Sequence, residues 1–279
     1  MSIEGAVKTP ETFHRARLIA EDFDDTAFRT FEKSPSGVGV AEAYTLSIED
    51  MFGSEALSAF LSGGGLRNRA PIEVVQQLAP DAKNEELNRL VQELTETKLN
   101  ILMGEIGTRF LDGSLWPRPT EGYLDLCAMI EAARQEGQLI DDAIISSGHE
   151  PFIEKTFKVW SIDIPTHVIA TETTQRIVVD LEEAPENLIK PSPLLMGVAR
   201  SMWAQGYGVK IPARNGLSND EKRRIVYVGD DLVKDGGLAE NSGVAFELID
   251  PANSGQTWQR VASRLQIGNF NAKNRGEDV

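Results

Sequence analysis

The sequence predicts an α/β protein with a Rossmann-like, doubly wound parallel sheet and an α-helical domain inserted after the first strand. Short apolar runs of β type recur along the chain, and helical patterns separate the later ones. A long, mainly helical stretch separates the first run from the second. The runs lie at 17–20, 143–146, 167–170, 224–229 and 244–249. Such alternation is typical of a parallel sheet that helices cover on both faces.

Composition narrows the class of protein. The chain has 279 residues, of which 41% are hydrophobic, enough for a sizeable core. It contains neither a run long enough to span a membrane nor an apolar leader at its start, so we expect a cytoplasmic protein. With 43 acidic and 28 basic residues its net charge is -15, which argues against binding nucleic acid or anionic lipid. An anionic small molecule would need a local cationic site.

The boundaries of the domains follow from these patterns. We expect an α/β core at 1–30 and 117–267, a helical domain at 31–116 and a disordered polar tail at 268–279. Within the helical domain, Ser47 and Asp50 resemble a capping box, a second helix begins at Pro71, and a third has an apolar face from Leu87 to Leu102. In the core, the stretch RIVVDLEE at 176–183 also allows a hairpin.

Polar side chains follow the predicted strands at four places. Ligands of open parallel sheets bind at the carboxyl ends of the strands, so these groups are expected to meet at one edge. The four groups are Glu21-Asp22 with Asp24-Asp25, Ser146-Ser147-Gly148, Lys190 ahead of a helix, and Gly229-Asp230-Asp231 with Asp235. Buried carboxylates are costly unless a cation balances them. A cationic partner is therefore expected among them.

In this order, the four motifs resemble those of the haloacid dehalogenase-like superfamily in its phosphatase branch. The resemblance implies that Asp22 is a nucleophile that forms an aspartyl-phosphate, and that Asp24 is the general acid and base. It implies that Ser146 donates to the phosphoryl oxygens, and that Lys190 pairs with both Asp22 and the phosphate. Mg²⁺ would be held by Asp22, the main-chain carbonyl of Asp24 and Asp230, with Asp231 and Asp235 as further groups near the metal. Thr26, Ser147, Gly148, Arg67 and Arg69 are candidates for binding substrate.

The resemblance favours hydrolysis of a small phosphorylated metabolite, with a phosphosugar mutase and a non-catalytic binding protein as alternatives. Asp24 argues against dehalogenation, because a departing halide needs no acid. Two residues depart from the family pattern: Glu21 replaces a usually apolar residue, and Asp25 stands where many members have glycine. His149, in the first turn of a predicted helix, is expected at the surface. Neither the substrate nor the oligomeric state follows from the sequence.

Overall fold

The computed structural model describes residues 7–65, 71–83, 85–181, 188–250 and 253–267. The chain divides into two compact units, one formed by Met1–Arg29 with Pro119–Val279 and the other by Thr30–Arg118. The expectation of a disordered tail falls on 268–279, outside the described residues. Within the described ranges, no helix combines the length and the apolar character that crossing a membrane requires.

The first unit is built on a parallel sheet, which confirms the predicted fold class. Among the described residues this sheet has five strands in the order β5-β4-β1-β6-β7. Their bounds are β1 (Arg17–Glu21), β4 (Ile140–Ile145), β5 (His167–Ile169), β6 (Ile225–Gly229) and β7 (Ala245–Leu248). The central strand β1 pairs in register with β4 on one side and β6 on the other. The ends of β1, β4 and β6 therefore lie next to one another.

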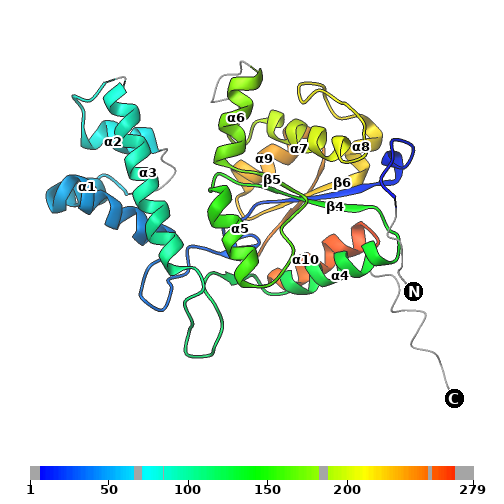
Figure 1. Ribbon diagram of the computed structural model, residues 1–279, viewed down its shortest axis with the longest axis horizontal. Helices are drawn as coiled ribbons and strands as arrows, with labels where there is room; N and C mark the ends of the chain where they lie inside the picture. The colour runs from blue at the N-terminus through cyan, green and yellow to red at the C-terminus, as the bar shows by residue number, and fades with distance from the viewer. Residues whose placement is uncertain (1–6, 66–70, 84, 182–187, 251–252, 268–279) are drawn as a thin grey trace. The chain divides into compact units, whose positions relative to one another are not determined.

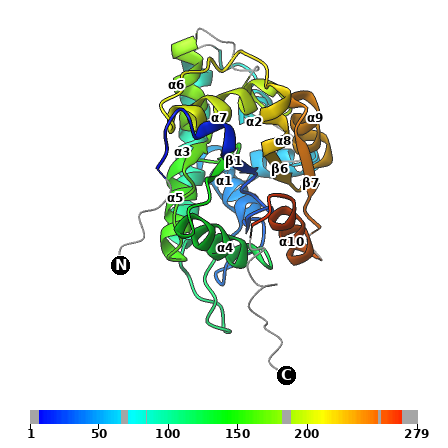
Figure 2. The ribbon, with the colours of Figure 1, turned by 90° about the vertical axis from the view of Figure 1, so that its right-hand side faces the viewer.

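Helices cover both faces of this sheet. Figure 1 shows α4 (Tyr123–Gln135) and α10 (Ser254–Arg264) on one face, with α7 (Pro193–Gln205) and α9 (Gly237–Ser242) on the other. The same layering is visible in the rotated view of Figure 2. The remaining elements of this unit are η1 (Phe13–Arg15), β2 (Phe28–Arg29), α5 (Glu150–Val159), α6 (Thr171–Leu181), α8 (Asn219–Arg224) and the π-helical turn η3 (Leu232–Gly236).

The two faces of the sheet pack against different groups of buried side chains. Leu18 and Ala20 of β1 belong to a cluster with the buried Trp203 of α7. On the opposite face, the rings of Tyr123 and Trp258 lie 5.1 Å apart between centroids. Because successive side chains of a strand point to opposite faces, Asp22 continues the row of Leu18 and Ala20, whereas Glu21 turns toward the aromatic face. Adjacent carboxylates thus enter different environments.

The second unit is helical. It contains α1 (Val40–Ser62), α2 (Pro71–Leu78) and α3 (Glu85–Glu105), and β3 (Arg118–Pro119) lies at its end. Its core gathers Tyr44, Ile48, Phe60, Val74, Val75 and Leu94, with Leu87, Leu90 and Val91 packed against it.

The predicted start of the first of these helices is wrong. Gly39 is the N-cap of α1, and Glu42 at the third helical position accepts a bond from the Gly39 amide, 3.1 Å. Ser47 lies inside the helix, where its hydroxyl donates to the Ala43 carbonyl, 2.7 Å. Gly53, with φ 83°, interrupts the helix. The sequence pattern around Ser47 was misleading because a serine hydroxyl can make two kinds of bond. At an N-cap it accepts from an amide of the first turn, and inside a helix it donates to the carbonyl of the preceding turn.

The allowed hairpin at 176–183 is also wrong in its described part, because α6 runs through Thr171–Leu181 as a helix. The β-branched run Ile177-Val178-Val179 has the local propensity of a strand. Both Ile177 and Val178 pack against the core cluster of the sheet. Tertiary packing therefore overrides the local propensity at this segment.

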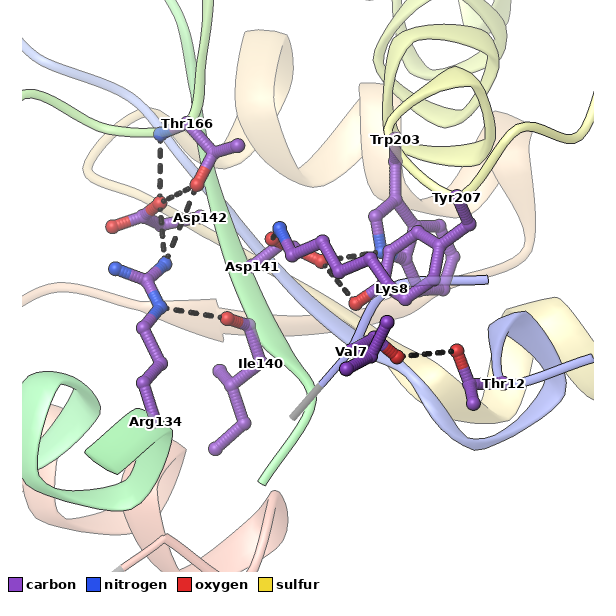
Figure 3. Close-up of polar contacts among 10 residues, drawn as sticks. All are labelled: Val7, Lys8, Thr12, Arg134, Ile140, Asp141, Asp142, Thr166, Trp203 and Tyr207. Atoms are coloured by element: carbon purple, nitrogen blue, oxygen red, sulfur yellow. Dashed lines mark hydrogen bonds and ion pairs between the residues drawn. The ribbon is translucent and has the colours of Figure 1, made fainter. Parts of the chain in front are cut away.

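A buried carboxylate fixes the amino end of the sheet. Asp141 of β4 is fully buried and accepts bonds from Trp203 Nε1, 3.1 Å, and Tyr207 OH, 2.7 Å, while Lys8 pairs with it. Figure 3 shows the next residue, Asp142, facing the other way toward Arg134. Asp141 thereby connects the segment before β1 to α7 and its C-terminal turn.

Replacing Asp141 with alanine is expected to lower the free energy of unfolding by about 3 kcal/mol, because it leaves buried donors without an acceptor and an ion pair broken. Asp220→Ala is the matched control, since the side chain of Asp220 is 56% exposed where it pairs with Arg224, and its loss should cost less than about 1 kcal/mol. Urea unfolding of both variants checks this. Equal losses would contradict the assigned role of Asp141.

Candidate active site

The centre of the candidate site is a lysine held between two aspartates. Lys190 Nζ lies 2.7 Å from Asp22 Oδ1 and 2.8 Å from Asp235 Oδ1, and its side chain is only 6% exposed. Burial alone would lower the pKa of Lys190, but the two carboxylates outweigh it and raise that pKa above its usual value. The ammonium group is therefore charged at neutral pH, as a partner of anions must be.

Asp235 positions this lysine. Its Oδ1 also accepts from Tyr227 OH, 2.9 Å, and its Oδ2 accepts from the Asp231 amide, 3.1 Å. The Asp235 side chain packs closely against the backbone of Gly229, since a Cβ atom built on Gly229 would lie 2.4 Å from it. Glycine is thus required where β6 ends, and η3 brings Asp235 back over that end. Single π-helical turns often occur at functional sites.

Three carboxylates converge beside the lysine. Within the described residues, Asp22, Asp230 and Asp235 each place an oxygen within 4.8 Å of the others. Burial raises the pKa of Asp22 to about 7, although Lys190 opposes this shift. Burial, with a contribution from Asp235, likewise raises the pKa of Asp230 to about 6. The cluster therefore carries more negative charge than one ammonium group balances.

This donor set fits a divalent metal ion. Carboxylate oxygens are the preferred ligands of Mg²⁺, and a bound cation would favour the ionised forms of Asp22 and Asp230, which burial and neighbouring carboxylates disfavour. Asp231 has a structural role instead. Its Oδ1 accepts from the amides of Val233, 2.8 Å, and Lys234, 3.0 Å, and so caps the start of η3. Thr26 lies next to the cluster, where its hydroxyl donates to Asp230 Oδ1, 3.3 Å.

The second predicted motif lies on the other side of Asp22. Ser146 follows β4 and is buried, and its hydroxyl oxygen accepts from the Gly148 amide, 2.9 Å, and lies 3.5 Å from Asp24 Oδ2. A Cβ atom at Gly148 would lie 3.1 Å from the Ser146 hydroxyl and 3.5 Å from Asp24 Oδ2. Ser146, Gly148 and Asp24 are thus brought together, whereas Ser147 is exposed. The predicted substrate contacts Arg67 and Arg69 lie outside the described residues.

Both departures from the family pattern have structural explanations. Asp25 has φ 53°, in the left-handed region where glycine is favoured and aspartate is tolerated. Glu21 turns to the opposite face of the sheet, where Tyr123 OH donates to its Oε1. Glu21 and Asp22 therefore have different partners, and Glu21 does not belong to the carboxylate cluster of Asp22, Asp230 and Asp235.

No family model matches the sequence, and the search of curated proteins likewise found no match. Solved structures do resemble the chain. CbbY from Rhodobacter sphaeroides, solved with phosphate, has 16% identity and a TM-score of 0.48, covering 83% of this chain and 84% of that chain. Clostridium difficile β-phosphoglucomutase has 10% identity and a TM-score of 0.49, covering 90% and 97%. The magnesium-bound putative HAD hydrolase YfnB of Bacillus subtilis has 14% identity and a TM-score of 0.46, covering 91% and 100%.

Several of the similar structures are named as HAD hydrolases or phosphatases. The chemistry assigned to this chain depends on its own side chains.

Sequence reasoning missed one residue of the site, Tyr227, and misplaced another, His149. Tyr227 reads as an ordinary residue of an apolar strand, yet burial and the charges of Asp22 and Asp235 raise its pKa well above the usual value, so it stays a hydrogen-bond donor. The expectation of a surface His149 is wrong: the residue is buried, and its Nδ1 lies 2.9 Å from Glu172 Oε1. Glu172 belongs to α6, so no local sequence pattern predicts the contact between His149 and Glu172.

The buried Glu21 predicts a specific pH dependence of stability. Burial raises its pKa from 4.5 to about 8. Between these values the folded protein keeps a proton that the unfolded chain releases, so the free energy of unfolding falls as pH rises. Glu21→Gln removes this titration and is expected to make the metal-free protein more stable than wild type at pH 8, by on the order of 3 kcal/mol.

Urea unfolding at pH values from 4.5 to 8, with a chelator present, measures this difference. The two proteins should have similar stability at the acidic end and diverge toward pH 8. Parallel stability curves for wild type and Glu21→Gln would contradict the assignment of a protonated Glu21.

Proposed function

We propose that this protein is a Mg²⁺-dependent phosphatase of the haloacid dehalogenase type that hydrolyses a small phosphate monoester through an aspartyl-phosphate on Asp22. The observation that carries the proposal is the buried Lys190 between Asp22 and Asp235, next to the cluster with Asp230. A phosphate monoester is a dianion, so its transfer depends on neutralising charge and on holding the reacting groups in line. This site has charges suited to that task.

In the proposed reaction, Asp22 is the nucleophile and Asp24 transfers the protons. An oxygen of Asp22 attacks phosphorus, the bond from phosphorus to the leaving oxygen breaks, and Asp24 gives that oxygen a proton. In the second step Asp24 takes a proton from water, the water oxygen attacks phosphorus, and the bond to Asp22 breaks. Inorganic phosphate leaves and the Asp22 carboxylate is restored.

Ser146 and Lys190 act on the phosphoryl oxygens throughout. The hydroxyl of Ser146 donates to one of them, and the ammonium group of Lys190 offsets their charge while it orients Asp22. Mg²⁺, held by Asp22, Asp230 and the Asp24 carbonyl, with Asp235 close by, would supply further neutralisation of the transferring group. Asp235 and Tyr227 keep Lys190 in place.

Release of inorganic phosphate tests this function. The full chain is incubated with methyl phosphate, p-nitrophenyl phosphate and a panel of sugar phosphates, with Mg²⁺ or with a chelator. Phosphate release that requires Mg²⁺ is expected. Isomerisation of a sugar phosphate without release would favour a mutase instead. Binding of Mg²⁺ without either reaction would overturn the enzymatic function and favour a binding protein.

A further inference from the structure

A cavity opens directly beside the candidate catalytic residues, and the reaction proposed above does not use most of it. Its volume is about 490 Å³, and both Ser146 and Lys190 contribute to its wall. This volume is in the usual range for pockets that bind small molecules. Because the cavity shares two residues with the site, a molecule bound to the site through its phosphoryl group can extend into the cavity.

One wall of the cavity is a single face of α6. The four residues that α6 contributes are Thr171, Thr174, Gln175 and Val178. Their spacing is i, i+3, i+4 and i+7, which places them in one row along a helix. The row begins close to the site, since the Thr171 hydroxyl donates to the carbonyl of Gly148, 2.7 Å.

The opposite wall is apolar. Leu188 and Ile189 precede Lys190, and Leu195 follows it in α7. Leu188 and Leu195 are buried, whereas the side chain of Ile189 is 58% exposed. Together with Val178 these residues give the cavity four aliphatic side chains, and the other α6 residues and Ser147 add only hydroxyl and amide groups.

The part of the cavity wall that the structure describes has almost no charge. Among the lining residues that the structure describes, Lys190 is the only ionised side chain, and it already pairs with Asp22 and Asp235. A second phosphate, a carboxylate or an amine on the ligand would meet no free counter-charge among these described residues, so its desolvation would oppose binding. An aliphatic or aromatic group would instead gain free energy from the apolar walls.

We infer that this cavity binds the leaving group of the substrate, and that this group is an uncharged, largely apolar organic group such as an alkyl chain. The inference rests on the proposed phosphatase function and adds the class of ester to it. The phosphoryl group lies at Asp22, Ser146 and Lys190, and the organic group extends between α6 and the Leu188–Ile189 segment.

A series of alkyl phosphates tests the inference without changing the chemistry of the leaving alcohol. The full chain with Mg²⁺ is assayed on methyl, butyl and hexyl phosphate, with glycerol 3-phosphate as the polar counterpart. Each methylene group buried in the cavity is expected to raise kcat/KM by about fourfold. Hexyl phosphate should therefore exceed both methyl phosphate and glycerol 3-phosphate by at least about 100-fold.

Two variants connect this preference to the cavity. Val178→Thr puts a hydroxyl into the wall and is expected to lower the ratio of kcat/KM for hexyl phosphate to that for methyl phosphate about tenfold. Ile177→Thr is the matched control, because Ile177 is also partly buried and packs against the same core cluster but does not line the cavity. It should leave the ratio of hexyl to methyl phosphate unchanged. If Val178→Thr does not fold, Thr174→Phe fills the cavity and should lower the same ratio.

The outcomes distinguish a failure of the cavity assignment from a failure of the proposed phosphatase function. Hydrolysis of methyl phosphate with no gain along the alkyl series, or with glycerol 3-phosphate preferred, would overturn the cavity assignment and leave the phosphatase function standing. A preference for long chains that neither Val178→Thr nor Thr174→Phe reduces would also overturn it. Failure to release phosphate from any ester would overturn the function and the inference with it.

Discussion

Replacing Asp22 with asparagine is expected to abolish Mg²⁺-dependent phosphate release, with a fall in kcat of at least about a thousandfold. Asparagine keeps the size and shape of the side chain, but its amide group cannot form the covalent phosphoryl intermediate. The fold should persist, because burial raises the pKa of Asp22 to about 7 and a neutral amide in this place has no charge to desolvate.

The control for this variant is Asp142→Asn, the same change on the neighbouring strand β4. Asp142 pairs with Arg134 and accepts from the Thr166 amide, 2.8 Å, away from the candidate site. Its replacement should leave turnover near that of wild type. Both proteins are compared by phosphate release and by thermal unfolding. Retention of more than about a tenth of the wild-type rate in a folded Asp22→Asn variant would exclude Asp22 as the nucleophile.

Replacing Lys190 with methionine is expected to have the second largest effect. Methionine preserves the length of the side chain but removes the charge that lies 2.7 Å from Asp22 and 2.8 Å from Asp235. Losing this electrostatic contact with the transferring group should lower kcat by about 100- to 1000-fold. The buried carboxylates would also be left without their cation, so the free energy of unfolding should fall by about 3 kcal/mol near neutral pH.

The stability loss of Lys190→Met should depend on pH in a defined direction. Burial raises the pKa of Asp22 to about 7, so at pH 5 Asp22 is protonated and needs the cation less, whereas at pH 8 it is ionised and needs it most. Urea unfolding of the metal-free variant at pH 5 and pH 8 measures this. A loss that is the same at both values would mean that Lys190 acts through packing alone. A similar kcat for Lys190→Met and wild type would remove the lysine from the proposed mechanism.

The elements that the sequence predicted well have a simple physical signal. Strands buried on both faces are continuous apolar runs, so β1 and β6 stand out, and polar residues directly after them indicate the edge where ligands bind. The pairing of Lys190 with Asp22 was implied only by the resemblance, because Lys190 lies just before α7 and not at the end of a strand. Residues joined only by tertiary contacts give no such signal, as with Tyr227 and its bond to Asp235.

The helix α6 is the most instructive error. Its run Ile177-Val178-Val179 has the propensity of a strand. The sequence also carries a helical pattern, because the residues that face the cavity and the core recur at helical spacing. Packing against a cluster assembled from distant segments decided between them. The consequence is functional as well as structural, because a hairpin would not present Thr171, Thr174 and Val178 in one row beside the candidate site.

The most direct test of the central claim is to trap the phosphoryl-enzyme. The full chain is mixed with Mg²⁺ and its best ester, quenched in acid, digested and analysed by mass spectrometry. We predict that a phosphoryl group is found on the peptide that contains Asp22, and that the same treatment of Asp22→Asn leaves this peptide unmodified. A wild-type enzyme that turns over its ester while the phosphoryl group is found on a different residue would contradict the proposed mechanism.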